Sequence, residues 1–389
     1  MKTITVKLFV SLFFLATAML SGVTNTWADH ITGVISIPGF SDLSDPAHPH
    51  AASFDIGFTS RGKYYFADRG PTATAYGDCH GRVTVIDTQT DTLDDPICGF
   101  LGNQGSGVSG PNGILVIPAA NELWGGDGDS TVKVVDLTTK SIKNSINTGG
   151  KKRADEIAYD PTDDVILVAN DSEDLPAMGG TGQFLTLIDR GTGNMLGQIF
   201  YNGNDAPLAT AGMEQPVFDE NTGLFYQAVP ATTDNPGGEI DAIDPVTIKI
   251  VARFPTTDCI PHGLTLGPLN QLLLGCSDVV DPGAGLQIMD DRNGNILAVI
   301  PQVAGADESW YNSGDRRYYV AASSCTVAIC GGPVLAIIVA DTGAFVENVP
   351  TTTGAHSVAT DARTNQTFIP VGPVAGPFSD NPGVAVSVR

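Results

Sequence analysis

Short apolar runs separated by turn residues recur along the whole chain. The segment "DEIAYDPTDDVILVANDS…GQFLTLIDRGTGNMLGQIFYN" (155–202) contains four such runs, each bounded by Asp, Pro, Asn, Thr or Gly. Alternation with a period of two, and brief apolar stretches between turn signals, are typical of β-strands. No stretch shows a convincing amphipathic helical period. The pattern therefore predicts a unit of four strands.

This four-strand unit repeats seven times. Its third strand is the easiest to recognise, in "VTVIDTQT" (83–90), "VKVVDLTT" (132–139), "LTLIDRGT" (185–192), "IDAIDPVT" (240–247), "LQIMDDRN" (286–293) and "LAIIVADT" (335–342). The copies begin near Phe54, Asn112, Asp155, Glu214, His262, Asp307 and His356. Repeats of this length predict a solenoid, a propeller or a similar array.

The two ends of the chain distinguish between these architectures. The last copy stops at "GVAVSVR" without a fourth strand, whereas "HITGVISIPG" (30–39) precedes the first copy as a spare strand. A seven-bladed, all-β propeller with four-stranded blades explains both, because the N-terminal strand completes the last blade and closes the ring. A β-solenoid or a pair of sandwiches leaves them unexplained. We expect residues 29–389 to form this single domain.

Repeats such as "DPTDDVILVAND" and "TVKVVDLTT" resemble those of the YVTN-type propeller superfamily, which shades into lactonase and gluconolactonase-like propellers. The resemblance covers residues 30–389. It implies the propeller fold and favours a lactone or another ester as substrate. The superfamily also includes a lyase, redox-protein subunits and non-catalytic surface proteins, so the resemblance assigns no catalytic residue.

One repeated position carries the candidate chemistry. In a propeller, the first residues of each innermost strand lie at one mouth of the central channel. Aligning the repeats places there Asn112, Asp155, Glu214, His262, Asp307 and His356, with Phe54 in blade one and Asp55 beside it. A shift of one residue would bring in Glu156, Gln215 and Glu308 instead.

The mixture of acids and histidines at this position predicts a metal site. Two carboxylates 4 Å apart repel by about 4 kcal/mol at an effective dielectric constant near 20, and a bound cation relieves this repulsion. Imidazole and carboxylate donors together favour zinc, iron, manganese or copper over calcium. We expect one divalent ion, with ligands from His262, His356, Asp307, Glu214, Asp155 and Asn112. The first four are also the candidate catalytic residues. Alternatively, the ring only lines a polar channel.

A second set of polar residues is expected at the same mouth, where the second strands end. Arg69 follows one such strand, Asn170 ends another, and Arg153 precedes the third repeat. We predict that all three bind substrate, and that the two arginines bind a substrate carboxylate or phosphate. The alternative for each arginine is an ion pair with one of the surplus acids.

The N-terminus and the cysteines indicate export. Residues 1–28 combine two lysines, an apolar run and small residues before Asp29, as in a secretory signal peptide. Six cysteines suit a disulfide framework in an oxidising compartment. We expect the local pairs 79–98, 259–276 and 325–330. We expect a periplasmic or extracellular monomer without a membrane span after signal removal.

Charge and missing motifs narrow the function. The net charge is −23, and loss of the two signal lysines makes it −25, which disfavours nucleic acid as a partner. No GxSxG, HExxH, P-loop or CxxCH motif occurs. The leading hypothesis is a metal-assisted hydrolase or lyase acting on a small or oligomeric substrate. The alternatives are a non-catalytic binding propeller and a metal-dependent oxidoreductase or metal-handling protein.

Overall fold

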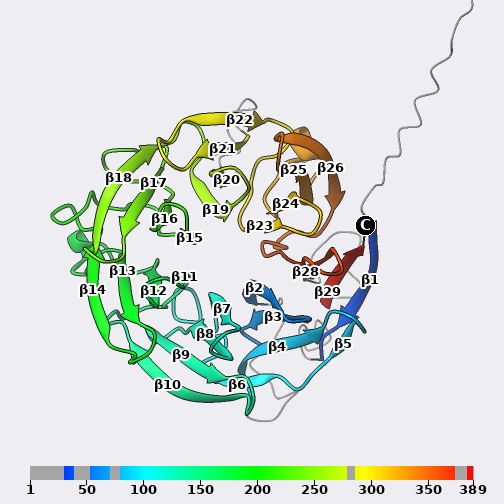
Figure 1. Cartoon of the computed structure of the whole chain (residues 1–389), viewed down its shortest axis with the longest axis horizontal. Helices are drawn as coiled ribbons and strands as arrows, with labels where there is room; N and C mark the ends of the chain where they lie inside the picture. Colours follow the sequence, from blue (N-terminus) through cyan, green and yellow to red (C-terminus); the bar gives the residue numbers. More distant parts are fainter. Residues whose placement is uncertain (1–29, 39–52, 71–78, 278–284, 373–382, 389) are drawn as a thin grey trace, which may run out of the picture.

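Seven β-sheets surround a central channel like the blades of a propeller (Figure 1). The computed structural model describes residues 30–38, 53–70, 79–277, 285–372 and 383–388. The predicted signal peptide, residues 1–28, lies outside this range. The all-β, seven-bladed fold expected from the repeats is confirmed.

Each blade contributes one strand to each of four concentric layers. The innermost strands are β2 (Phe54–Ser60), β7 (Ile114–Ile117), β11 (Ile157–Asp160), β15 (Pro216–Asp219), β19 (Pro261–Leu266), β23 (Ser309–Asn312) and β27 (Ala359–Asp361). The second strands are β3 (Lys63–Asp68), β8 (Glu122–Gly126), β12 (Val165–Asn170), β16 (Leu224–Val229), β20 (Gln271–Cys276), β24 (Arg317–Ala322) and β28 (Gln366–Val371).

The third and outermost layers follow in the same order. The third strands are β4 (Gly81–Asp87), β9 (Thr131–Asp136), β13 (Phe184–Asp189), β17 (Glu239–Asp244), β21 (Leu286–Asp290), β25 (Val334–Val339) and β29 (Gly383–Val388). The outermost strands are the pair β5 (Thr92–Leu93) and β6 (Ile97–Phe100), then β10 (Ser141–Asn147), β14 (Met195–Phe200), β18 (Lys249–Pro255), β22 (Ile296–Ile300), β26 (Ala344–Pro350) and β1 (His30–Ser36).

The N-terminal strand closes the ring, as predicted. β1 pairs antiparallel with β29, from His30 opposite Val388 to Ser36 opposite Gly383, so the last blade has the order β1-β29-β28-β27. This pairing covers the edge that β29 would otherwise expose. The outermost strand of blade one differs from the expected pattern, because β5 and β6 pair with β4 as two separate pieces.

The recurring aspartate at the end of the third strand fixes the turn that follows it. Asp136 Oδ1 accepts hydrogen bonds from the backbone N–H groups of Thr138 at 2.7 Å and Thr139 at 3.2 Å. Asp87 and Asp244 make the same contacts in their blades. This side-chain turn explains why an aspartate marks the end of most third strands in the sequence.

The hydrophobic core lies between neighbouring blades. Between blades three and four, for example, Leu167, Leu185 and Tyr201 pack in one cluster with Phe225 and Ile243. Strands buried on both faces read as continuous apolar runs, which is why the repeats are visible in the sequence. In the described part of the chain the helices are α1 (Val327–Cys330) and the 3-10 turn η1 (Pro176–Met178), and neither could cross a membrane.

The three predicted disulfides are present. They join Cys79 to Cys98, Cys259 to Cys276, and Cys325 to Cys330. The second is fully buried, and it connects the loop that leads into β19 with the end of β20. It therefore fixes the start of the innermost strand that carries His262.

Opening the disulfides should destabilise the protein in order of loop length. By the chain-entropy relation, replacing Cys259 and Cys276 (17 residues apart) by alanine should lower the free energy of unfolding by about 3 kcal/mol. Replacing Cys325 and Cys330 (5 residues apart) should cost only about 2 kcal/mol. Urea unfolding of the two double variants measures both values. A larger loss for the shorter loop would contradict this ordering.

Candidate functional site

The residues at the start of the innermost strands meet at one mouth of the channel. A repeated hydrogen bond to the second strand identifies equivalent positions: Asp155 N–H donates to the Ala169 carbonyl at 2.7 Å and Glu214 N–H to that of Ala228 at 3.0 Å. Asp307 makes the same bond in its blade. The mouth ring, as we call it, consists of Asp55, Asn112, Asp155, Glu214, His262, Asp307 and His356.

Blade one contributes Asp55 to this ring, so the alignment that began this repeat at Phe54 was wrong by one residue. Phe54 pairs with Asp68 and Gly57 with Phe66, and the irregularity between these pairs adds a residue to β2. The Phe54 ring instead stacks on the imidazole of His356, with centroids 4.6 Å apart and an interplanar angle of 5°.

One half of the ring forms a group of three potential ligands, Glu214, His262 and Asp307. His262 Nδ1 lies 3.6 Å from Glu214 Oε1 and 3.7 Å from Asp307 Oδ1. One ligand atom from each residue lies within 4.8 Å of the other two. All three side chains are partly exposed at the mouth. Neither carboxylate forms an ion pair with an arginine or lysine of the described residues.

Burial and neighbouring charges together set the pKa values of His262 and Glu214. Burial alone would lower the pKa of His262, but the carboxylates of Glu214 and Asp307 outweigh it and raise that pKa to about 9. Burial raises the pKa of Glu214 to about 7, with His262 opposing the shift and Asp307 adding to it. Without a metal ion, His262 therefore carries a proton at neutral pH between two acids.

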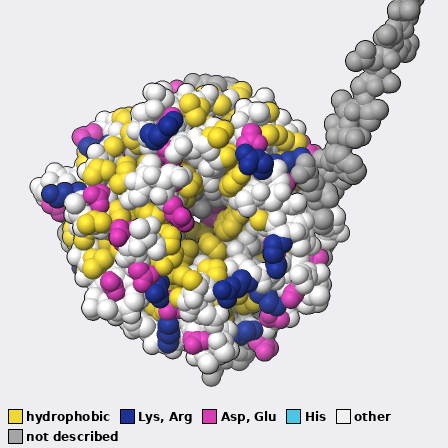
Figure 2. All heavy atoms as spheres, viewed as in Figure 1, with side chains coloured by type: hydrophobic (Ala, Val, Ile, Leu, Met, Phe, Trp, Pro, Cys, Tyr) yellow, Lys and Arg dark blue, Asp and Glu magenta, His cyan; other side chains and the backbone are white. Residues whose placement is uncertain are grey.

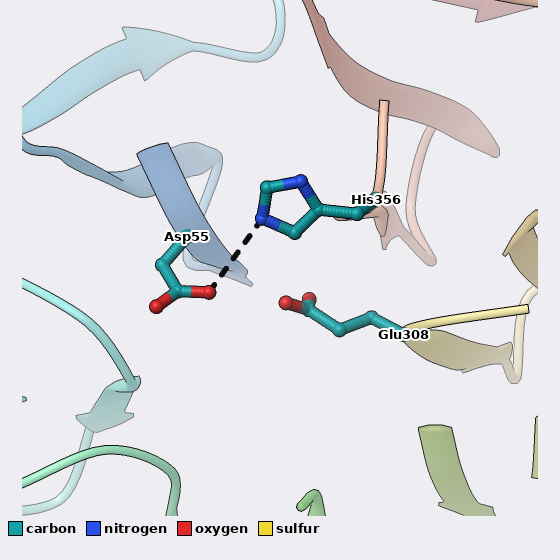
Figure 3. A group of neighbouring side chains, drawn as sticks. All are labelled: Asp55, Glu308 and His356. Atoms are coloured by element: carbon teal, nitrogen blue, oxygen red, sulfur yellow. Dashed lines mark ion pairs between the residues drawn. The ribbon is translucent and has the colours of Figure 1, made fainter. Parts of the chain in front are cut away.

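A second group consists of Asp55, Glu308 and His356, which point toward one another from three different blades (Figure 3). His356 Nε2 lies 3.6 Å from Asp55 Oδ1, and its Nδ1 lies 2.8 Å from the Gly354 carbonyl oxygen. Glu308 comes from the position after Asp307, and its backbone N–H donates to the His356 carbonyl at 3.1 Å.

The three residues of the second group have shifted pKa values, each for a different reason. Burial alone would raise the pKa of Asp55, but Arg69, His356 and Arg153 together hold it well below its usual range. Burial alone would lower the pKa of His356, but its contact with Asp55 raises it. Burial raises the pKa of Glu308 well above its usual value, and Asp55 adds to the shift. Asp55 is thus charged at neutral pH, whereas His356 and Glu308 each keep a proton to a higher pH than an ordinary histidine or glutamate.

Two arginines bind the acids of blades one and three. Arg153 bridges Asp155 at 2.7 Å, Asp171 at 2.5 Å and Asp55 at 3.4 Å. Arg69 forms an ion pair with Asp55. These contacts correspond to the alternative in which the arginines pair with surplus acids rather than with a substrate.

The two remaining predicted ring ligands are already occupied. Asn112 Oδ1 accepts hydrogen bonds from Arg69 Nε at 3.1 Å and Nη2 at 2.7 Å, and its Nδ2 donates to the Ala154 carbonyl at 3.0 Å. Asp155 is held by Arg153, as described above. Neither therefore joins the Glu214, His262 and Asp307 group, and the expected six-ligand set divides into separate clusters.

Asn170, predicted to bind substrate, is fully buried. Its Nδ2 donates to Ser130 Oγ at 2.9 Å and to the Arg153 carbonyl at 3.1 Å. These bonds hold the loop that carries Arg153 against the end of β12. In this structure Asn170 therefore positions Arg153 and does not face the channel mouth.

A second polar layer lies one residue farther along the innermost strands. It contains Glu156, Gln215 and Glu308, the residues that a one-residue shift of the alignment brings to the channel. Gln215 Oε1 accepts from the N–H groups of Leu264 at 2.9 Å and Ser309 at 3.3 Å, so it ties blades four, five and six together. The adjacent acids in "ADE" (154–156 and 306–308) were the sequence signal for this layer.

Glu156 is the most isolated acid of the second layer. Its side chain is buried, and its Oε2 has no hydrogen-bond partner among the described residues. Burial raises the pKa of Glu156 well above its usual value, and the charges of Glu308 and Glu214 add to the shift. Glu156 therefore holds a proton where an exposed glutamate has lost it.

Glu156→Gln should make the protein more stable at neutral and alkaline pH. Because the folded-state pKa of Glu156 is raised, its contribution to stability is present below the ordinary glutamate pKa and is lost as the pH rises. The variant should gain about 1.4 kcal/mol over wild type for each pH unit in that window. Urea unfolding at pH 5 and pH 8 tests this, with the exposed Glu220→Gln as control. A difference that does not grow with pH would contradict it.

Comparisons with known proteins support the fold alone. No protein-family model and no curated protein matches the chain. The chain is similar to a chain in the crystal structure of a mitotic checkpoint complex, with a TM-score of 0.64 and 11% identity over 100% of this chain and 99% of the other. It is also similar to a chain of Kuenenia stuttgartiensis hydrazine synthase, with a TM-score of 0.63 and 14% identity over 86% and 95%. Both likenesses are consistent with a β-propeller.

Proposed function

We propose that the protein is an exported, metal-assisted hydrolase or lyase with one divalent metal ion at the mouth of its channel. Glu214, His262 and Asp307 would hold the ion. The observation that carries this proposal is the position of His262 Nδ1, 3.6 and 3.7 Å from two carboxylates that no arginine or lysine of the described residues neutralises. The arginines bind the acids on the opposite side of the ring instead.

The spacing of the three donor atoms fits a metal ion. Two atoms that are each about 2.0–2.2 Å from a metal ion lie about 3.4 Å apart at a tetrahedral angle. The two distances from His262 Nδ1 exceed this by only a few tenths of an ångström, and the Glu214 and Asp307 oxygens lie within 4.8 Å of each other, so small side-chain rotations would bring the three donors onto one ion. Binding would displace the proton held by His262, because an imidazole binds metal in its neutral form.

The donor set narrows the choice of metal. One imidazole nitrogen and two carboxylate oxygens favour zinc, iron, manganese or copper, whereas calcium prefers oxygen alone. Three protein ligands leave coordination positions open, as in catalytic rather than structural sites. When bound, such an ion would polarise a carbonyl oxygen or lower the pKa of a coordinated water.

The chain's own residues would supply the remaining functions at this mouth. Arg69 and Arg153 hold the acids of blades one and three. Those acids therefore do not turn toward the half of the mouth ring that contains Glu214, His262 and Asp307. Glu308 is next to Asp307 in the chain, and burial raises its pKa well above the usual value, which supports a role as the proton donor to a leaving group. The contact with Asp55 raises the pKa of His356, which would support the same proton-donating role.

The substrate class rests on the resemblance of the repeats to lactonase-type propellers, so a lactone or another ester is proposed. Three disulfides are compatible with an exported protein. The test is hydrolysis of a panel of lactones and aryl esters by the mature protein loaded with zinc, manganese or iron. We expect activity that a chelator removes and that Asp307→Asn lowers strongly. Activity indifferent to both changes would refute the proposal.

A further inference from the structure

The opposite end of the channel contains a large apolar cavity. It has a volume of about 440 Å³ and is lined by the innermost strands of blades one to six. Figure 2 shows hydrophobic side chains gathered around a hollow at the centre of one face, on which no histidine is visible. The volume lies within the range of about 300–1,000 Å³ typical of small-molecule sites.

Aromatic side chains form much of the cavity wall. Phe58, Tyr159, Trp310 and Tyr311 all line it, and each is only half-buried although it lies inside the ring of blades. Phe58 and Trp310 meet edge to face, with ring centroids 5.2 Å apart. These contacts hold the rings in place, so the wall is formed before a ligand arrives. Aromatic faces of this kind attract apolar bodies and cations.

The inner end of the cavity carries a buried acid. Glu156 lines the cavity and is only 6% exposed, and its Oε2 has no hydrogen-bond partner in the described part of the chain. Gln215 lies beside it, but its amide oxygen is already used by Leu264 and Ser309. A buried acceptor without a partner is costly, and a ligand that donates a hydrogen bond would satisfy it.

The charge of the cavity selects among ligands. Besides Glu156, the only charged residue among those that line it is the exposed Glu220, and no lysine, arginine or histidine does so. Glu156 holds a proton when no ligand is bound, and a cation beside it would favour its charged form. An ammonium group would therefore find both an acceptor and aromatic faces, whereas a carboxylate or phosphate would meet no basic residue among the described lining residues. The strongly negative net charge of the chain acts in the same direction.

We propose that this cavity binds a hydrophobic organic amine, with its apolar body against Phe58, Trp310 and Tyr311 and its ammonium group on Glu156. The site is separate from the mouth ring in which the metal is proposed. It suits a molecule with an aromatic or aliphatic body and a single cationic head. Anionic amphiphiles are excluded by the same chemistry.

Three probes that share a phenyl-alkyl chain but differ in the terminal group test this proposal: 4-phenylbutylamine, 4-phenylbutanol and 4-phenylbutyrate. Their binding to the mature protein is measured by calorimetry and by the fluorescence of Trp310, with Trp310→Phe identifying the signal. We expect the amine to bind about tenfold or more tightly than the alcohol, since charge-assisted hydrogen bonds contribute that much. The butyrate should bind least.

Variants locate the interaction. Glu156→Gln should lower the affinity for the amine about tenfold or more and the affinity for the alcohol far less, so the preference for the amine is lost, whereas Glu220→Gln at the rim should change the preference little. Removing metal with a chelator should not change the binding of the amine. The cavity proposal can therefore fail or hold independently of the metal proposal. Equal affinity for all three probes, preference for the butyrate, or no binding at all would overturn the proposal.

Discussion

His262→Ala is expected to lower the affinity of the protein for Zn²⁺ by about 100-fold or more, since substitutions even of residues that only support metal ligands cost about 10–100-fold. The variant loses the one nitrogen donor between Glu214 and Asp307 and leaves two carboxylates that repel each other. Competition with a chromogenic zinc chelator measures the affinity directly. Circular dichroism confirms that the variant is folded.

Two other histidines provide matched controls for this experiment. His80 is exposed and lies outside the mouth ring, so His80→Ala should bind zinc like the wild type. His356 belongs to the group with Asp55 and Glu308, so His356→Ala should have a much smaller effect than His262→Ala. A larger loss in His356→Ala would place the metal in that second group and contradict the assignment.

Arg153→Met is expected to cost about 3 kcal/mol of unfolding free energy at neutral pH, as when one partner of a buried ion pair is removed. Its side chain is 22% exposed and bridges Asp55, Asp155 and Asp171. Because Arg153 helps to lower the pKa of Asp55, the stability it supplies is present above the ordinary aspartate pKa and is lost as the pH falls. The deficit of the variant should therefore shrink below pH 4.

An exposed arginine provides the control for this second prediction. Arg292 pairs with Asp290 at 2.7 Å, but its side chain is 60% exposed. Arg292→Met should change the stability by less than about 1 kcal/mol, as is usual for surface ion pairs. Urea unfolding at pH 7 and at about pH 2 compares both variants. Equal losses would show that Arg153 is free for a substrate rather than committed to the ring.

The fold could be predicted from the sequence because every blade repeats the same pattern of buried strands separated by turns. Both faces of the inner strands are buried, so runs such as Val165–Asn170 are visible as apolar segments between turn residues. The spare strand at His30–Ser36 and the missing strand after Gly383–Val388 could be counted without any structure. The local cysteine pairs were predictable for a similar reason, since each closes a short loop.

The composition of the mouth ring was also predictable, but its pairing was not. The repeat identified Glu214, His262 and Asp307 as neighbours. Which acids remain free of arginine depends on Arg69 and Arg153, whose side chains reach the ring from loops outside the repeated pattern. The bulge in β2 that replaces Phe54 by Asp55 likewise has no clear signal in one sequence.

The apolar cavity could not be read from the sequence at all. Phe58, Leu115 and Trp310 occupy ordinary apolar positions in predicted strands, and the same residue types fill the core between blades. Only the radius of the closed ring decides whether such side chains meet across the channel or leave space between them.

The most direct test of the metal assignment is elemental analysis of the mature protein purified without chelator, beside the triple variant Glu214→Gln/His262→Ala/Asp307→Asn. The account predicts about one transition-metal ion per wild-type chain and none in an equally folded triple variant. Equal metal content in the two proteins, or no metal in either after incubation with zinc, manganese and iron, would contradict it.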